Sequence, residues 1–320
     1  MCKSNKTLNK AKQSKFDEFY IIKEDAYQTI SGYSEQYAGK SVYCNTDDYR
    51  ISNVWKVFCE NFHKWKLKSL TATGFNKHGH GIYAHYDGDT LTTSNLKGNG
   101  DFRSMECVNI LMESDICVTC PPFSLNREYL HLMYNSGKLF LTLSALTVCS
   151  YPWVIERFKN REITRSNEIT NSPRFTVPSS YKSKSIKVLD DGTRIASVRC
   201  IWLTNMLTLK FSYKKLSMKK LSESNHEYIT TSSGKKVLFP KAINDIPVDY
   251  SGLMRLPITC VNFINPKTGF IEGSFKSEYS VVEQNIKVLG NEKDTTGDYR
   301  FYDDDGNKKF VGIVVEKTIF

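Results

Sequence analysis

The chain contains 320 residues with a mass of 36.7 kDa, and its 40% hydrophobic and 24% charged residues exclude an intrinsically disordered protein. Lysine and arginine number 44 against 34 aspartates and glutamates, so the net charge of +10 favours a polyanionic partner such as a nucleic acid. Charge alone does not separate such a protein from one that is merely basic.

Short apolar runs alternate with helical stretches over the first half of the chain. In chain order, the spacing predicts a strand over 41–44, a helix over 54–65, a strand over 67–73, a helix over 105–113, a strand over 115–119, a helix over 127–134 and a buried strand over 138–148. Strands separated by helices of this length are typical of crossover units. We therefore predict an α/β protein with a parallel sheet and helices on both faces.

Three polar clusters lie next to these elements. Residues 45–48 come after the first strand, residues 100–102 precede a helix, and residues 120–123 follow the strand over 115–119. Ligands of parallel sheets bind outside the carboxyl ends of the strands. These clusters are therefore the predicted walls of a binding site.

The composition changes after about residue 151. As far as about residue 240 the chain is rich in Lys, Arg, Ser and Thr, with strand-like pieces at 174–177 and 199–204. Lysines are interleaved with aromatic residues here: Lys210, Lys214, Lys215, Lys219, Lys220, Lys235 and Lys236 with Phe211, Tyr213 and Tyr228. This pattern is typical of phosphate and base contacts, and the alternative is a solvated outer face.

No membrane segment, disulfide or metal site is predicted. The chain lacks the roughly 18 consecutive apolar residues of a spanning helix, and its nine scattered cysteines are typical of a reducing, cytoplasmic setting. Cys117 and Cys120 form a single C-x-x-C pair, and His78, His80 and His85 lie in or beside a glycine-rich stretch. Structural zinc sites usually need four ligands, which neither group supplies.

The motif Cys120-Pro121-Pro122-Phe123 directly follows a predicted strand. Two consecutive prolines fix φ and remove two N–H donors, which leaves their carbonyls as acceptors in a stiff loop. A base extruded from a duplex could be held by these acceptors and stack on Phe123, which contributes about 1–3 kcal/mol. Such turns also occur as plain connectors, so the motif alone leaves both interpretations open.

Several segments resemble, in the same order, those of the EcoRI-type adenine-specific DNA methyltransferases, from about residue 16 to about residue 266. They are D-E-F-Y at 17–20, G-K-S-V-Y-C-N-T-D-D at 39–48, G-N-G-D-F-R-S at 98–104, D-I-C-V-T-C-P-P-F-S-L-N-R-E-Y at 115–129, R-F-T-V-P at 174–178, I-W-L-T-N at 201–205 and A-I-N-D-I-P-V-D-Y-S-G-L-M-R-L-P-I-T at 242–259. The resemblance implies a Rossmann-like methyltransferase fold that binds S-adenosylmethionine and methylates adenine at N6 in duplex DNA.

The resemblance also implies roles for individual residues. It places cofactor binding on three segments: Asp17, Phe19 and Tyr20 in an arm that closes over the cofactor, Asn45, Asp47 and Asp48 in the first strand-end loop, and Asp101 and Phe102 at the adenine end. The catalytic loop, written N-P-P-F in the family, corresponds to Cys120, Pro121, Pro122 and Phe123.

Cys120 departs from the family at the residue that contacts the target amine. In the family an asparagine oxygen and the first proline carbonyl accept the two amine hydrogens and stabilise the charge that grows during methyl transfer. Pro121 keeps the second acceptor, whereas a thiol is a weak one. Losing one such group costs about 2.7–4 kcal/mol. The sequence thus leaves open an active methyltransferase and a catalytically weak or silent DNA-binding relative.

Two further alternatives have less support. An RNA-binding module is indicated only by charge and interleaved aromatics. A nucleophilic Cys120 acting on cytosine is disfavoured, because in that chemistry the proline normally precedes the cysteine.

We divide the chain into a cofactor-binding and catalytic core at 1–150, a DNA target-recognition region at 151–240, and a C-terminal part at 241–320 that packs back on the core. The expected partners are double-stranded DNA and a cognate restriction endonuclease that acts on the same site.

Overall fold

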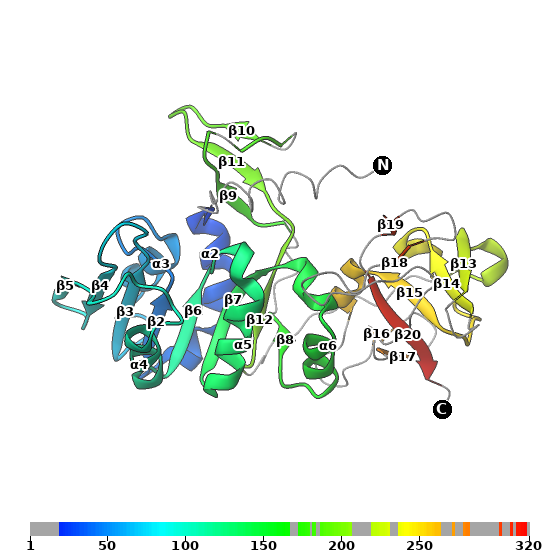
Figure 1. The fold of residues 1–320 in the computed structure, drawn as a ribbon, viewed down its shortest axis with the longest axis horizontal. Coiled ribbons are helices and arrows are strands. Elements are labelled where there is room, and N and C mark those ends of the chain that lie inside the picture. The colour runs from blue at the N-terminus through cyan, green and yellow to red at the C-terminus, as the bar shows by residue number, and fades with distance from the viewer. Residues whose placement is uncertain are drawn as a thin grey trace. The chain divides into compact units, whose positions relative to one another are not determined.

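The computed structural model describes residues 19–166, 172–179, 181–183, 186–206, 219–230 and 236–263, and the short strand segments 271–272, 278–281, 301–302, 308–309 and 312–318. The chain forms two compact units. Unit 1 comprises Met1–Ala145 and Ser166–Lys210, and unit 2 comprises Leu146–Arg165 and Phe211–Phe320. Figure 1 labels the helices and strands of both units.

The large sheet of unit 1 has a parallel centre. Its strands β3 (Ser69–Gly74), β2 (Ser41–Asn45), β6 (Ile116–Thr119) and β7 (Leu139–Ala145) lie side by side in this order and run parallel. Towards one edge, β4 (Ile82–Tyr86) and β5 (Leu91–Asn95) add an antiparallel hairpin beside β3, and on the other side β12 (Cys200–Thr204) pairs antiparallel with β7 (Figure 1). The sheet is therefore mixed, and the parallel arrangement predicted from sequence is limited to its centre.

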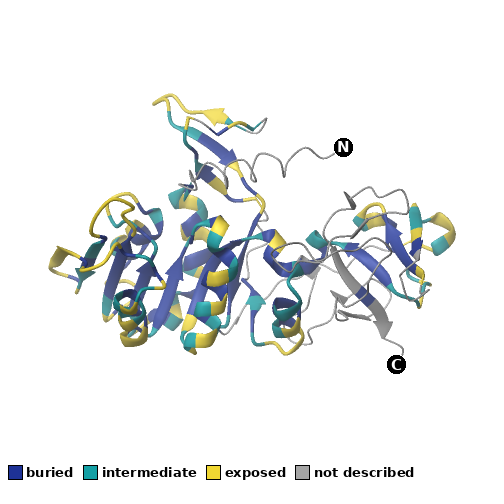
Figure 2. Cartoon of the chain, in the orientation of Figure 1, coloured by how far each residue is buried: buried dark blue, intermediate teal, exposed yellow. Residues whose placement is uncertain are grey.

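Helices cover both faces of this sheet. Successive strand residues point to opposite sides, so both faces carry side chains that pack against helices. Helices α2 (Lys23–Ile30) and α3 (Asn53–Glu60) share one core with Val42 and Leu70 of the strands. On the other face, the Cys117 thiol of β6 contacts Tyr129 of α5 (Asn126–Ser136), and Tyr43 of β2 contacts Cys107 of α4 (Met105–Glu113). Figure 2 shows the central strands of this sheet as largely buried and its β4–β5 edge as more exposed.

Several predicted boundaries shift by a few residues. Helix α3 begins after Ser52, whose hydroxyl accepts from Trp55 N, and ends at Glu60 instead of residue 65. Strand β7 stops at Ala145, because the following residues form the 3-10 helix η3 (Leu146–Ser150). Another 3-10 helix, η1 (Ser31–Tyr37), connects α2 to β2.

A small antiparallel sheet in unit 1 joins residues that are far apart in sequence. Its order is β1 (Tyr20–Ile21), β9 (Arg174–Thr176), β11 (Arg194–Ser197) and β10 (Lys187–Val188). The β10–β11 hairpin closes through Gly192 at φ 81°, and Figure 1 draws it as a ribbon that extends away from the large sheet.

Unit 2 contains α6 (Pro152–Lys159), β8 (Thr164–Arg165) and a second sheet. The order of this sheet is β13 (His226–Thr230), β14 (Lys236–Pro240), β15 (Met254–Pro257), β20 (Gly312–Thr318), β17 (Glu278–Val281) and β16 (Ile271–Glu272). The described residues of unit 2 also form the 3-10 helices η3, η4 (Leu221–Glu223), η5 (Ile243–Asp245) and η6 (Ile258–Phe263), and the strand pair β18 (Phe301–Tyr302) and β19 (Lys308–Lys309). Across the described parts of both units, no helix has the length and apolar character needed to cross a bilayer.

Candidate functional site

Strands β2 and β6 bring two of the predicted polar clusters to the same end of the sheet. The strands are parallel neighbours with Tyr43 opposite Cys117, so the residues that follow them leave the sheet at one edge. Thr46 Oγ1 lies 3.0 Å from Thr119 Oγ1 across this edge. Residues 45–48 and 120–123 are therefore adjacent, as the strand-end argument predicts.

Asp47 lies buried between these two loops. Its Oδ1 accepts a 2.6 Å hydrogen bond from Ser52 Oγ, its Oδ2 accepts from Thr119 Oγ1, and the carboxylate also accepts from the backbone N–H of Cys120. Burial raises the pKa of Asp47 to about 6, although these hydrogen bonds act in the opposite direction. Both carboxylate oxygens thus have hydrogen-bond partners within the protein.

Asn45, the last residue of β2, is also buried. Its Oδ1 accepts from the Tyr129 hydroxyl at 2.5 Å and from the Cys117 thiol at 3.1 Å. Burial raises the pKa of both donors, so they remain protonated. In the part of the chain that the structure describes, Asn45 Nδ2 makes no hydrogen bond.

The double-proline loop is also held at its second proline. The Pro122 carbonyl accepts from Leu125 N at 2.9 Å and from Asn126 Nδ2 at 3.3 Å. Asn126 Oδ1 in turn accepts from Ala145 N at 2.7 Å, which ties the loop to the end of β7. Among the described residues, none donates a hydrogen bond to the Pro121 carbonyl.

Burial raises the pKa of the Cys120 thiol well above its usual range, and the nearby Asp47 carboxylate acts in the same direction. Cys120 is therefore a neutral thiol at physiological pH. It offers neither the thiolate that would be a strong acceptor nor a side-chain oxygen.

Phe123 lies in an aromatic cluster beneath the small sheet. Its ring centroid is 5.9 Å from that of Phe19 and 5.7 Å from that of Phe175, and Tyr181 packs edge-on against Phe19 at 5.1 Å. Phe123 is only 6% exposed, so a base can stack on it only after a neighbouring ring moves.

The predicted arm is described from residue 19 onward. Phe19 contacts Phe123 of the double-proline loop through this cluster, and Tyr20 pairs with Thr176 of β9. The predicted cofactor residue Asp17 lies outside the described residues.

Asp48 and Asp101 form ion pairs near the surface. Burial acts to raise the pKa of Asp48, but hydrogen bonds from Arg50, with Arg50 Nη2 2.6 Å from its Oδ2, lower it overall. Hydrogen bonds from Arg103 lower the pKa of Asp101, with Arg103 Nη2 2.7 Å from its Oδ2. Both carboxylates are ionised at neutral pH, and both keep part of their surface exposed.

Glycines allow the loops that carry these two aspartates to meet. A Cβ on Gly100, at φ 79°, would lie 2.4 Å from the Gly74 carbonyl oxygen, and one on Gly74 would lie 3.1 Å from the Asp48 Cα. Side chains would separate these backbones, and φ 79° itself favours glycine. The ends of β2 and β3 and the start of α4 therefore converge.

Phe102 is buried within this group of loops. Its ring packs edge-on against Tyr129 at 5.2 Å, while the Arg103 guanidinium lies 5.4 Å from its centroid. The side chain thus links the loop before α4 to helix α5.

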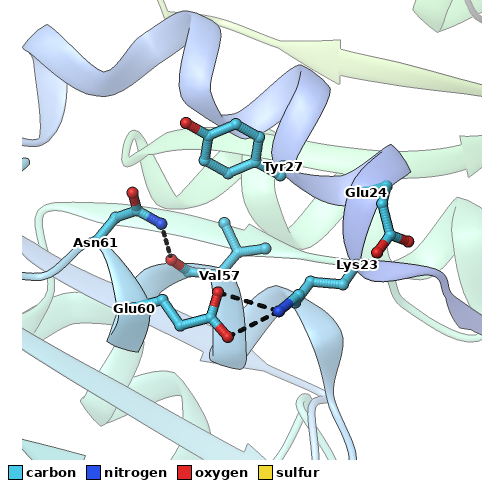
Figure 3. A pocket seen from close by; sticks show the side chains of 6 residues that line it. All are labelled: Lys23, Glu24, Tyr27, Val57, Glu60 and Asn61. Carbon is cyan, nitrogen blue, oxygen red and sulfur yellow. Dashed lines mark hydrogen bonds and ion pairs between the residues drawn. The ribbon is translucent and has the colours of Figure 1, made fainter.

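A cavity of about 420 Å³ lies elsewhere, between α2 and α3 (Figure 3). Its lining includes the Lys23–Glu60 ion pair, with 2.9 Å between Nζ and Oε1, and Tyr27. None of the residues predicted for the site lines it.

The predicted histidine and lysine groups are dispersed or lie outside the described residues. His80 contacts the Lys97 carbonyl and His85 contacts Thr71, and no group of three metal-ligating side chains occurs within the described ranges. The eight described cysteines are free thiols. Outside the described residues lie Lys210, Phe211, Tyr213, Lys214, Lys215 and Lys235. Of the rest of that pattern, Lys219, Lys220 and Lys236 are exposed at least in part, and Tyr228 is 44% exposed.

Sequence reasoning missed the residues that hold the loops in place. Thr119 and Ser52 engage Asp47, and Tyr129 engages Asn45. Ser52 carries a signal, since serine before an apolar helical run indicates a helix cap. Tyr129 carries none, because only the fold brings it within reach of a strand 84 residues away.

The sequence matches the profile of the family described as adenine-specific methyltransferase EcoRI over residues 7–93 and 83–318. The type II methyltransferase M.EcoRI of Escherichia coli is 35% identical over 286 residues, which cover 82% of this chain and 87% of that protein. M.MpnI of Mycoplasma pneumoniae is 30% identical over 315 residues, covering 97% and 98%, and M.MgeORF184P of Mycoplasma genitalium is 28% identical over 317 residues, also covering 97% and 98%. No solved structure matches the chain. The profile covers nearly the whole sequence, and the chain therefore belongs to the EcoRI family of adenine-specific methyltransferases.

Proposed function

We propose that this protein transfers a methyl group from S-adenosylmethionine to N6 of adenine in duplex DNA, as the modifying enzyme of a type II system with a cognate endonuclease. One observation carries the proposal. The double-proline loop lies at the carboxyl end of central strand β6, and within the described residues the carbonyl of the buried Pro121 accepts no hydrogen bond.

The loop residues have separate tasks. The Pro121 carbonyl accepts a hydrogen from the adenine amine and stabilises positive charge on nitrogen as the new bond forms. The Pro122 carbonyl, held by Leu125 and Asn126, keeps the loop rigid, so the acceptor needs little reorganisation. Phe123 stacks on the extruded base once the covering rings have moved.

The residues at the strand ends fit S-adenosylmethionine in part. Asp48 and Asp101 are ionised and partly exposed acceptors, suited to hydroxyl and amine donors, and Asn45 Nδ2 is a donor without a partner among the described residues. Asp47 does not fit, because its carboxylate is already engaged. When bound, the cofactor supplies an electrophilic methyl group on a sulfonium.

We assign cofactor binding and catalysis to residues 1–150 on a Rossmann-like arrangement, DNA recognition to 151–240, and support of the core to 241–320. The parallel centre of the sheet, with helices on both faces, supports the first assignment. Within the recognition region, we propose that the β10–β11 hairpin enters the major groove, which admits a two-stranded ribbon.

Exposure and charge favour the hairpin for this task. Val188 is 66% exposed and Leu189 is 46% exposed, so two apolar side chains face solvent on this hairpin. In the major groove they would contact the methyl groups of thymine. Residues 181–199 contain Lys182, Lys184, Lys187, Arg194 and Arg199 against Asp190 and Asp191, an excess of basic groups. Such an excess suits the phosphate backbone.

A catalytically silent, DNA-binding relative is the second candidate. The neutral Cys120 thiol favours it, since the loop retains one good acceptor where the family has two. Losing one such acceptor slows transfer by about 10²–10³.

Incorporation of a labelled methyl group into DNA tests both candidates. The wild type and Cys120→Asn are incubated with labelled S-adenosylmethionine and DNA of mixed sequence, and the digested DNA is analysed for N6-methyladenine. We expect weak labelling by the wild type and about 10²–10³ times faster labelling by Cys120→Asn.

Cys59→Asn is the matched control, because it introduces the same residue at another half-buried cysteine, away from the loop. A silent wild type with an active Cys120→Asn variant establishes the silent relative. Labelling of cytosine, or none by either protein, rejects N6 methylation.

A further inference from the structure

We infer that Asp47 is a positioning residue: its carboxylate holds the first residue of the double-proline loop against the end of β2 and so fixes the place of the Pro121 carbonyl. The inference rests on the proposed function, in which that carbonyl contacts the target amine. This positioning role is proposed for Asp47 in place of the cofactor contact that the family resemblance implies.

The contacts of Asp47 join three segments of the chain. Ser52 Oγ donates from the start of α3, Thr119 Oγ1 donates from the end of β6, and Cys120 N–H donates from the loop itself. Because Pro121 and Pro122 lack N–H groups, Cys120 carries the last backbone donor before Phe123. Asp47 therefore holds the loop at the one donor beside its prolines.

The backbone next to Asp47 supports the same role. Thr46 has φ 73°, a left-handed conformation that is uncommon for a β-branched residue. This conformation turns the chain so that the Thr46 hydroxyl lies 3.0 Å from that of Thr119. Strained backbone of this kind persists only where surrounding contacts determine it.

The hydrogen bonds among Asp47, Thr119 and Asn45 have two arrangements, one for ionised and one for protonated Asp47. The Thr119 hydroxyl carries one hydrogen but lies within hydrogen-bonding distance of both the Asn45 carbonyl and Asp47 Oδ2. When Asp47 is ionised, that hydrogen serves only one of them. When Asp47 is protonated, Asp47 donates to Thr119 and Thr119 donates to Asn45. A single proton therefore decides how strongly the carboxylate attracts the Cys120 N–H.

The ionised form holds the loop more firmly, because hydrogen bonds to a charged acceptor are roughly twice as strong as neutral ones. The other titratable groups around Asp47 do not share its proton. Burial raises the pKa of the nearby Cys44, Cys117, Cys120 and Tyr129 side chains, which stay neutral. The adjacent Asp48 is ionised and paired with Arg50.

Amide hydrogen exchange at Cys120 tests the contact without any need for activity. Asp47→Asn keeps the shape of the side chain and resembles the protonated form. We expect its Cys120 amide to exchange about tenfold faster than that of the wild type at neutral pH. The control is Asp115→Asn, which alters a carboxylate bonded to Ser41 N at the other end of β6. Equal exchange in Asp47→Asn and the wild type would overturn the inference.

Kinetics then separate positioning from cofactor binding. We expect Asp47→Asn to lower kcat by about 10–100-fold while the Kd for S-adenosylmethionine changes less than about twofold. In the wild type kcat falls as the pH drops through about 6, whereas the variant lacks this dependence. A raised Kd with unchanged kcat would show a cofactor ligand instead.

A second variant and an activity-independent readout cover the cases in which Asp47→Asn does not fold or the wild type is inactive. If Asp47→Asn does not fold, Thr119→Val removes a hydroxyl that lowers the pKa of Asp47. More of Asp47 is then protonated at neutral pH, and exchange at Cys120 must also be faster. If the wild type transfers no methyl group, the proposed function fails while the exchange experiment still decides the role of Asp47.

Discussion

At the scale of a single residue, the raised pKa of Asp47 lowers the free energy of unfolding at neutral pH. Its pKa is about 6 when folded, against an ordinary value of 3.8, so between these pH values the folded protein keeps a proton that the unfolded chain has lost. The free energy of unfolding therefore decreases as the pH rises through this window, by about 3 kcal/mol in total, and stays lower above it.

Asp47→Asn should remove this pH dependence. We expect the melting temperature of the variant, relative to the wild type, to rise between acidic and neutral pH and then level off above about pH 6. Thermal melting followed by circular dichroism measures it, with Asp115→Asn as the reference. Parallel melting curves at all pH values would show that Asp47 has an ordinary pKa.

Sequence could locate Asp47 but not its role. Its position after an apolar strand placed it at the sheet edge, whereas its partner Thr119 is 72 residues away and is brought close by the pairing of β2 with β6. The same holds for Phe123: its aromatic character suggested stacking, but the rings of Phe19 and Phe175 that cover it come from distant segments.

At the scale of elements, the proposed contact of the β10–β11 hairpin with the major groove of DNA can be tested directly. We expect the double substitution Val188→Ser with Leu189→Ser to weaken binding to cognate DNA by about tenfold or more, because both apolar contacts with thymine methyl groups are lost. Fluorescence anisotropy with labelled duplex measures the affinity.

The comparison for this experiment is Leu91→Ser on β5. Leu91 is 48% exposed on the β4–β5 hairpin, so this change also replaces an exposed apolar side chain with serine. Equal affinities for the two proteins would exclude the β10–β11 hairpin from the DNA interface.

Elements with a strong local pattern were predictable. Helix α4 spans the expected residues 105–113, and β6 starts one residue later than predicted. The hairpin of β4 and β5 was missed although Asp87-Gly88 is a turn signal, because every residue of β5 is exposed and the strand shows no alternation. The two-residue strands β1 and β10 have no period that a sequence can reveal.

At the scale of the whole molecule, the net charge of +10 favours the proposed binding to DNA. We expect the affinity for duplex DNA to fall by about a hundredfold or more between about 50 and about 200 mM salt, because lysines and arginines displace condensed counterions. Titrations at several salt concentrations give the slope. An affinity that does not depend on salt, or tighter binding to structured RNA, would contradict a duplex-DNA partner.

The pairing of β1 with β9 has a consequence for synthesis of the protein. The Thr176 hydroxyl and the Tyr20 carbonyl that it contacts are 156 residues apart, so a ribosome must complete more than half of the chain before the two strands can meet. Until then Phe123 has no cover from Phe175, and the growing chain presents an apolar surface that other nascent chains could contact. Unit 1 thus closes late in translation, when the residues around 174–198 have left the exit tunnel.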